Sequence, residues 1–181
     1  MKQAIVIGTG KGRAHWVADC LASLDVPIPV IVVCTDGYEL GKIKWVYDNT
    51  DIDRFIFLQD SVVVRNNELL MRLFEAPGSA CLMDDPVCMG SYMGLYERTT
   101  LSKVEIPRST TKQDSINYEV GWTKKYVEAC ENYSHPLVIR HKIVETVYKH
   151  GRENRLYVNG IYEKWKGTWQ DDSGRIHGSL E

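Results

Sequence analysis

The sequence predicts one α/β domain, a Rossmann-type three-layer sandwich with a mainly parallel central sheet. Three observations lead to this prediction. Short apolar runs alternate with helical patterns, a helical pattern separates the first two runs, and the 181 residues suit a single domain. Strands that are joined through a helix run parallel and are buried on both faces, which accounts for runs that are continuously apolar.

The N-terminal part contains a strand-helix-strand unit and a third strand. Residues 4–7 and 30–34 are continuous apolar runs that predict buried strands, and residues 15–24 carry apolar side chains at helical spacing. We therefore expect the first two strands to be parallel. A short helix or turn over residues 38–49 leads to the third strand, over residues 54–58.

The middle of the chain continues this alternation. Residues 62–64 extend the third strand, and Asn66 or Asn67 is suited to cap a helix over residues 68–74. A fourth strand is expected over residues 80–83, where the chain is apolar again.

The C-terminal part begins with a glycine-rich stretch, residues 89–96, in which we expect another strand. A helix is predicted over residues 116–129 and a short strand over residues 137–139. One apolar face of this helix would be formed by Ile116, Val120, Tyr126, Val127 and Cys130. From residue 151 aromatic and basic residues interleave. We therefore divide the chain into an α/β domain, residues 1–150, and an extension, residues 151–181, that packs on the same domain.

Composition and cysteine usage narrow the class of protein. Lys and Arg number 22 against 24 Asp and Glu, so the net charge does not indicate a nucleic-acid partner. The five cysteines are odd in number, widely spaced and without a Cys-x-x-Cys pair, which favours a reducing, cytoplasmic setting. Cys20, Cys34 and Cys81 lie in apolar patterns and are expected to be buried. The apolar run near the N-terminus is too short for a signal peptide or a membrane span.

Polar residues gather where the predicted strands end. The four segments are Gly8-Thr9-Gly10, Thr35-Asp36-Gly37, Gln59-Asp60-Ser61 and Asp84-Asp85. In parallel α/β sheets, ligands bind beyond the carboxyl ends of the strands. These strand ends are therefore the main argument for a binding site.

The loop after the first strand has the spacing Gly8-x-Gly10-x-Gly12. It does not match the phosphate-binding motif Gly-x-x-x-x-Gly-Lys-Ser/Thr, because Arg13 follows Gly12, and it lacks the third glycine of the dinucleotide-binding motif. Such a loop still lets a nucleotide approach the backbone closely, with Lys11 and Arg13 facing phosphates. The alternative is a tight turn with solvated charges.

Asp36 and Asp60 each follow an apolar strand. A carboxylate at Asp36 is able to accept hydrogen bonds from a ribose hydroxyl or a base N–H. A single carboxylate at Asp60 suits Mg²⁺ or Mn²⁺, which would neutralise charge on a departing nucleoside diphosphate. Both aspartates are also ordinary turn or cap residues.

Three acidic residues are candidates for a catalytic base or for binding acceptor hydroxyls. Asp84 and Asp85 follow the fourth strand, and Glu119 lies within the predicted long helix. The alternatives are a strand-to-turn exit for the two aspartates and a solvated helix carboxylate for Glu119. The five histidines show neither metal-ligand spacing nor a Ser-His-Asp pattern.

The order of these features resembles GT-A-type, family-2-like glycosyltransferases. An aspartate follows the second strand, and a hydrophobic strand then ends in an aspartate motif. Residues 92–96, 103–107 and 162–169 are also similar to compact glycosyltransferase-like proteins of phages and bacteria. The family carries Asp-x-Asp at that strand end, whereas this chain has Phe57-Leu58-Gln59-Asp60-Ser61 and keeps one acid.

The resemblance implies a GT-A-like fold in which residues 1–150 bind a nucleotide sugar. It implies that Thr9, Gly10 and Asp36 hold the nucleotide and that Asp60 holds the metal and the diphosphate. The predicted set is completed by Lys11, Arg13, Gln59, Lys164 and Lys166. Because the Asp-x-Asp motif is incomplete, either the metal binds weakly or none is needed, and in the second case Lys164 or Lys166 neutralises the diphosphate.

We therefore predict a glycosyltransferase that moves a hexosyl or pentosyl group from a nucleoside diphosphate sugar, with Mn²⁺ or Mg²⁺ as the cofactor. Two alternatives stay open. The incomplete motif favours a non-catalytic nucleotide or sugar-nucleotide binding module, and a nucleotidyltransferase of related fold would instead release pyrophosphate. The acceptor and the oligomeric state are not assigned by the sequence.

Overall fold

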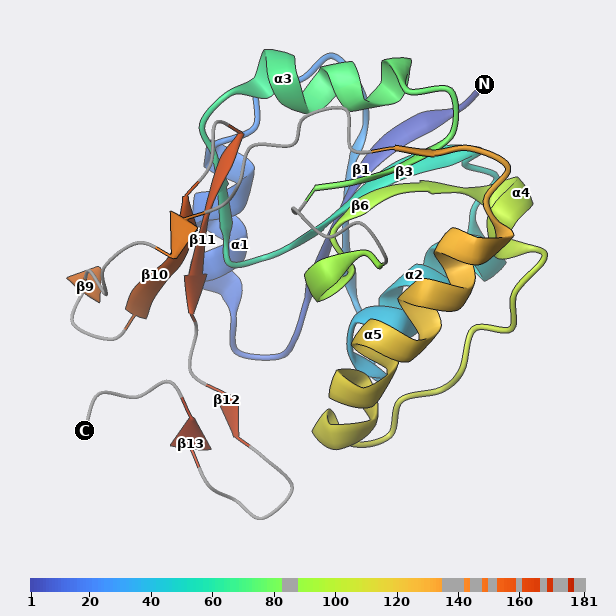
Figure 1. Ribbon diagram of the computed structural model, residues 1–181. Coiled ribbons are helices and arrows are strands. Elements are labelled where there is room, and N and C mark those ends of the chain that lie inside the picture. The colour runs from blue at the N-terminus through green and yellow to red at the C-terminus, as the bar shows by residue number, and fades with distance from the viewer. Residues whose placement is uncertain are drawn as a thin grey trace.

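A six-stranded sheet forms the centre of the protein. This computed structural model describes residues 1–82, 88–134, 142–143, 148–149, 153–158, 161–166, 169–170 and 176–177. The strands lie in the order β2-β1-β3-β6-β5-β7, and Figure 1 shows the central strands β1, β3 and β6 side by side. Their bounds are β1 Gln3–Thr9, β2 Val30–Cys34, β3 Arg54–Gln59, β5 Ser79–Cys81, β6 Gly94–Glu97 and β7 Tyr133–Ser134.

Most of the ladders in this sheet are parallel. β1 pairs in parallel with β2 and β3, and β5 pairs in parallel with β7. β6 runs antiparallel to its neighbours β3 and β5. The helix α1 (Ala14–Ala22) connects β1 to β2, as a parallel crossover requires. The mainly parallel α/β sheet predicted from the sequence is confirmed.

Helices cover both faces of the sheet. The helices α2 (Tyr38–Asn49) and α5 (Lys112–Ala129) lie on one side, and α3 (Asn67–Met71) lies on the other (Figure 1). Alternate residues of β3 enter the two cores: Phe55 and Phe57 pack on the α2 side, and Ile56 and Leu58 on the α3 side. This alternation follows from the two-residue period of a strand, and it gives the sandwich three layers.

The helix after β4 (Val62–Val64) is shorter than predicted. α3 ends at Met71, and the chain continues as the 3₁₀ helix η1 (Arg72–Glu75). Asn66, rather than Asn67, is the cap, because its side chain accepts a hydrogen bond from the Leu69 N–H at 2.9 Å.

A second sheet begins directly after the Gln59-Asp60-Ser61 strand end. Instead of extending β3, β4 turns away and pairs antiparallel with β11 (Tyr162–Lys166). The order of this sheet is β4-β11-β10-β8, with β9 paired to β10. The remaining bounds are β8 Lys142–Ile143, β9 Tyr148–Lys149, β10 Glu153–Val158, β12 Trp169–Gln170 and β13 Ile176–His177. The division of the chain at residue 150 stays a prediction.

The buried face of α5 agrees with the predicted face at Tyr126 but not at Ile116 and Val120. Ile116 and Val120 are 43% and 59% exposed. The buried positions are Ser115, Trp122, Thr123 and Tyr126. The rings of Trp122 and Tyr126 pack against each other with centroids 5.7 Å apart. These two large aromatic residues orient the helix, because they bury more apolar surface than Ile116 and Val120 would.

Three further predictions are settled or left aside by the structure. Cys20 and Cys81 are buried as expected, but Cys34 is exposed because it ends the edge strand β2. The strand expected over residues 137–139 lies outside the described residues. In the described part of the chain, the structure contains no helix with the length and apolar character to cross a membrane.

Candidate functional site

The ends of β1 and β3 lie side by side, and this brings Thr9 next to Asp60. Gly8 is opposite Gln59 in the ladder, and the Asp60 N–H donates to the Gly8 carbonyl oxygen at 3.1 Å. Thr9 Oγ1 then donates to Asp60 Oδ2 at 2.7 Å. Both side chains are buried, so this strand end is a fixed polar contact at the edge of the core.

Packing and turn geometry account for Gly8, within β1, and for Gly12, in the loop that follows. A Cβ on Gly8 would lie 2.5 Å from the ring of Phe57, which leaves no room for a side chain. Gly12 has a φ of +76°, in the left-handed region that other residues rarely adopt. A Cβ on Gly10 meets only ordinary contacts, with Arg13 Cδ at 3.6 Å. The loop therefore turns sharply and presents Arg13 at the carboxyl end of the sheet.

Arg13 and Asp60 form a two-point ion pair. Arg13 Nε donates to Asp60 Oδ2, and Nη2 donates to Oδ1, each at 2.6 Å. The side chain of Arg13 is 25% exposed, whereas that of Asp60 is 5% exposed. The guanidinium also lies over the ring of Trp16, 5.5 Å from its centroid. A buried carboxylate needs such compensation, and both oxygens of Asp60 receive it from this fork.

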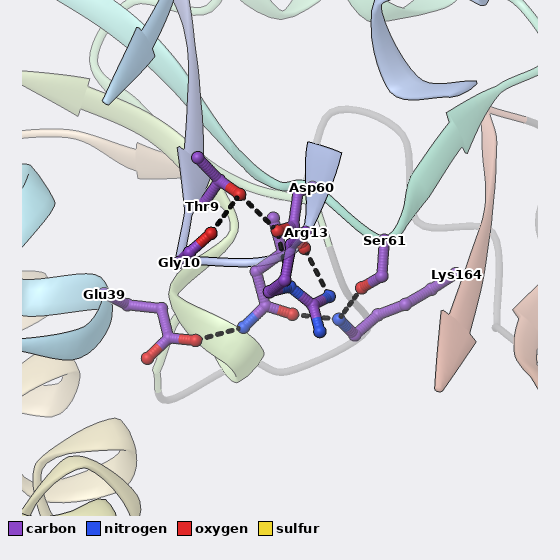
Figure 2. A network of polar contacts seen from close by, with 8 residues as sticks. Thr9, Gly10, Arg13, Glu39, Asp60, Ser61 and Lys164 are labelled. Atoms are coloured by element: carbon purple, nitrogen blue, oxygen red, sulfur yellow. Dashed lines mark hydrogen bonds and ion pairs between the residues drawn. The ribbon is translucent and has the colours of Figure 1, made fainter. Parts of the chain in front are cut away.

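A second chain of polar contacts runs beside this pair, as Figure 2 shows. Gln59 Nε2 donates to Glu39 Oε1 at 2.8 Å, and the ammonium of Lys164 donates to Gln59 Oε1. Lys164 Nζ also donates to Ser61 Oγ at 3.2 Å. Glu39 comes from the first turn of α2, and Lys164 is placed by the pairing of β11 with β4. Three parts of the chain that are distant in sequence therefore meet at the end of β3.

Charge and burial shift the pKa of two groups in this chain of contacts. Burial lowers the pKa of Lys164 to about 8; the charges of Glu39 and Asp60 oppose this shift, and that of Arg13 adds to it. Burial alone would raise the pKa of Glu39, but the neighbouring cations Lys112 and Lys42 and its hydrogen bonds hold it below its ordinary value. Glu39 is therefore a carboxylate at neutral pH.

Lys42 is a third cation close to the strand ends. Its Nζ donates to the carbonyl oxygens of Thr35 at 3.1 Å and Tyr38 at 2.8 Å. Burial lowers its pKa, and the surrounding acids, among them Glu39, partly restore it. Lys42 thus fixes the turn between β2 and α2, in which Asp36 lies exposed.

The structure brings six of the residues predicted for the site into one network: Thr9, Gly10, Arg13, Gln59, Asp60 and Lys164. Asp36, which follows β2, and Lys11, in the loop after β1, are exposed and lie outside this network. Asp84 and Asp85 lie outside the described residues, as does the side chain of Lys166, whose backbone belongs to β11.

Glu119 lies on α5 and faces the short 3₁₀ helix η2 (Gly90–Tyr92). Its Oε1 accepts a hydrogen bond from the Ser91 N–H at 2.6 Å. Ser91 has a φ of +53°, so this contact holds a backbone conformation that side chains disfavour. Glu119 is half-buried and lies one helical turn after Ser115, whose Oγ donates to Glu39, so both residues are on the side of α5 that faces the site.

Sequence reasoning missed Glu39, Lys42 and Ser115. Ser115 Oγ donates to Glu39 Oε2 at 3.1 Å, which locks the carboxylate between α5 and Gln59. An acid in the first turn of a helix and a lysine three residues later are typical of a solvated helix face. Their position in the sequence could have indicated a role, because Glu39 and Lys42 closely follow the Thr35-Asp36-Gly37 strand end, which is part of the predicted site.

The residues at Asp60 do not fit a divalent cation. Its Oδ2 accepts from Thr9 and Arg13, and its Oδ1 accepts from Arg13. Lys164 adds a second cation nearby. Within residues that the structure describes, no group of three or more His, Cys, Asp or Glu side chains could hold a metal ion. We therefore derive no step through a metal.

Comparisons with known proteins support the fold. No protein-family model matches the sequence, and no curated protein does. Among solved structures, residues 1–349 of the glycosyltransferase S. aureus TarS align with a TM-score of 0.53 and 12% identity over 77% of this chain. The same values hold for that TarS chain in complex with UDP. This chain spans 59% of the length of that TarS chain.

A197 from STIV also aligns, at 17% identity over 59% of this chain and 70% of its own, but its TM-score of 0.41 is too low to argue a shared fold. The likeness to TarS, together with the sheet order, shows the fold, which is a Rossmann-type, GT-A-like α/β sandwich.

Proposed function

We propose that this protein transfers a sugar from a nucleoside diphosphate sugar to an acceptor hydroxyl. The observation that carries the proposal is the buried Thr9–Asp60–Arg13 contact at the carboxyl ends of β1 and β3. Open α/β sheets bind their ligands at this edge. The TarS structure in complex with UDP supports it further, because it is a chain of the same fold that holds a nucleoside diphosphate.

The strand ends suggest how the donor would lie. Asp36 is exposed after β2, where its carboxylate is free to accept from a ribose hydroxyl or a base N–H. Thr9 and Gly10 border the same edge, and Lys11 and Arg13 follow in the loop. In this arrangement the nucleoside would lie toward β2 and the diphosphate toward the end of β3.

The reaction breaks the bond between the anomeric carbon and the diphosphate oxygen, and the nucleoside diphosphate leaves with the electron pair. An acceptor oxygen forms the new bond to that carbon and gives its proton to a carboxylate. We assign this base to Glu119, which is half-buried and oriented by the Ser91 N–H. Asp84 and Asp85 remain candidates for the same role or for binding the acceptor.

A panel of nucleotide sugars tests the proposal. The protein is incubated with UDP-, GDP-, CDP-, ADP- and dTDP-sugars, each with Mn²⁺ or with a chelator, and thermal stability and release of nucleoside diphosphate are measured. We expect one donor to stabilise the fold and to be hydrolysed slowly by water in place of the acceptor. Ligand at 100 times its Kd stabilises a protein by about 2.7 kcal/mol, which such a measurement detects.

Variants on one helix separate binding from turnover. Glu119→Gln should retain donor binding and lose most of the hydrolysis, whereas Glu128→Gln, an exposed acid on the same helix, should leave both unchanged. Binding without turnover on any acceptor would instead favour a binding module. Consumption of a nucleoside triphosphate with release of pyrophosphate would favour a nucleotidyltransferase. If no nucleotide or nucleotide sugar binds, the proposal is wrong.

A further inference from the structure

The end of β3 carries two cations that the fold brings together from distant parts of the chain. Arg13 reaches it from the loop before α1, and Lys164 reaches it from β11. The two charges are close enough that Arg13 acts to lower the pKa of Lys164. An anion with several oxygens is able to bridge two such cations, in addition to Asp60, which pairs with Arg13, and Glu39, whose charge acts on Lys164.

Arg13 is held by Asp60 and Lys164 by Gln59 and Ser61, and each cation retains hydrogen-bond donors. Asp60 takes two of the five guanidinium N–H groups of Arg13. Gln59 and Ser61 accept from two of the three ammonium hydrogens of Lys164. Figure 2 shows both charged groups in the space between Glu39 and Ser61. The remaining donors belong to side chains whose positions are already fixed.

We propose that Arg13 and Lys164 bind the donor diphosphate in place of a divalent cation, and that Asp60 positions Arg13 rather than holding a metal. This inference rests on the proposed function. A guanidinium matches the spacing of phosphate oxygens, and an ammonium adds a point charge beside it. A divalent cation would instead have to displace Arg13 from Asp60 and lie next to Lys164.

The two cations also suit the step in which charge develops. When the bond between sugar and diphosphate breaks, the electron pair moves onto the leaving oxygen, and negative charge on the diphosphate increases. Fixed positive groups stabilise that charge without having to reorganise. The site is prearranged in this way because Asp60 and Gln59 are rigid parts of a strand end, and both are hydrogen-bonded on a second side, by Thr9 and to Glu39.

The test is a titration of UDP, GDP, CDP, ADP and dTDP into the intact protein by calorimetry, in EDTA and in Mn²⁺. We expect one of these nucleoside diphosphates to bind with an affinity that differs by less than threefold between the two conditions. Arg13→Gln and Lys164→Met should each weaken that binding at least tenfold. Two matched surface variants, Arg72→Gln and Lys125→Met, should leave it unchanged, since both side chains are exposed away from the network.

A double-mutant cycle tests the positioning role of Asp60. Asp60→Asn should weaken nucleotide binding in the wild-type background but have little further effect once Arg13 is Gln, because it acts through Arg13. A purely structural role would instead lower stability in both backgrounds and leave affinity of the folded protein unchanged. Lys164→Arg, which keeps the charge, should restore most of the binding that Lys164→Met loses.

The outcomes separate the inference from the function on which it rests. Binding that requires Mn²⁺, or metal-free binding that neither Arg13→Gln nor Lys164→Met weakens, overturns the inference and leaves the proposed function standing. If none of the five nucleoside diphosphates binds in either condition, the proposed function fails and the inference with it. Should Lys164→Met not fold, Lys164→Gln, which keeps a polar end at the same position, takes its place.

Discussion

Arg13 donates to both carboxylate oxygens of Asp60, and Asp60 is the more buried partner of the two. The pair therefore links a loop whose conformation depends on glycine to a strand that is fixed in the core. An aspartate at a GT-A strand end is expected to face a metal, but here Asp60 accepts three hydrogen bonds from Thr9 and Arg13. The stability of the loop and the chemistry of the site consequently depend on the same carboxylate.

Removing the charge of Asp60 should destabilise the protein measurably. Asp60→Asn takes away one acceptor of the fork, so we expect a loss of about 2 kcal/mol, as for hydrogen bonds to charged groups. Urea unfolding followed by circular dichroism measures it. Asp48→Asn is the control, because its ion pair with Lys44 lies on the surface and should contribute less than about 0.5 kcal/mol. Equal losses of stability in Asp60→Asn and Asp48→Asn would contradict a buried ion pair between Arg13 and Asp60.

Two glycines should respond to alanine in opposite directions. At Gly8 a Cβ would lie 2.5 Å from the Phe57 ring, so Gly8→Ala should destabilise by about 2 kcal/mol through overpacking. At Gly121, within α5, nothing apart from its chain neighbours and the backbone of its own helix lies within 4 Å of the added Cβ. Gly121→Ala should therefore stabilise by up to about 1 kcal/mol, the difference in helix propensity. Thermal unfolding of both variants measures the two changes in stability. Shifts of the melting temperature in the same direction would be inconsistent with this packing.

The two faces of α5 should differ in their tolerance of substitution. Trp122→Ala removes a buried ring and should cost about 3 kcal/mol or more. Val120→Ser changes a side chain that is 59% exposed and should stay within about 0.5 kcal/mol. The midpoints of urea unfolding of the two variants, compared with that of the wild type, measure both effects on stability. A large loss of stability in Val120→Ser would instead indicate that Val120 lies on the buried face, as the sequence pattern predicts.

Nucleotide affinity should decrease with pH in the alkaline range. Burial lowers the pKa of Lys164 to about 8, and the charged groups that face it are Glu39, Asp60, Arg13 and Glu119. Because the diphosphate needs the protonated ammonium, affinity should fall as pH rises through 8, by up to about tenfold per unit. Calorimetric titration with the nucleoside diphosphate that binds, between pH 6.5 and 9.5, measures this profile, and Lys164→Arg should flatten it.

The stability of the free protein should change in the opposite sense. The pKa of Lys164 lies below its ordinary value of 10.5, so between about pH 8 and 10.5 the unfolded chain binds a proton that the folded chain has released. The contribution of this residue to stability therefore rises with pH in that window. Lys164→Met should lack this rise. A profile identical to that of the wild type would mean that Lys164 is solvated in the folded protein.

The fold was largely predictable because its signals are local. Continuous apolar runs placed β1, β2 and β3, and helical spacing placed α1 and α5. The pairing of β4 with β11 was not predictable, since residues 62–64 have the same apolar character whether they extend β3 or begin a new sheet. The buried face of α5 was predicted correctly at Tyr126 but wrongly at Val120, because periodicity alone did not distinguish Val120 from Trp122.

The site was predictable in its location and less so in its composition. Strand-end reasoning found Thr9, Gln59 and Asp60, because the ends of neighbouring parallel strands must meet at one edge. The contacts of Arg13 and Lys164 depend on a loop conformation and on a second sheet, and neither leaves a pattern in the sequence. Glu39 reads as an ordinary acid at a helix N-terminus, although it closes the network.

The pairing of β11 with β4 has a consequence for the order of events during synthesis. Gln59 and Lys164 are 105 positions apart, so most of the chain must be translated before they meet. Contacts of such long range form late, because the intervening chain must first lose its freedom. A nascent chain that has completed the β1-β2-β3 core would still lack its second cation. The protein would therefore acquire its anion-binding capacity as one of the last steps of its own production, well after its core has formed.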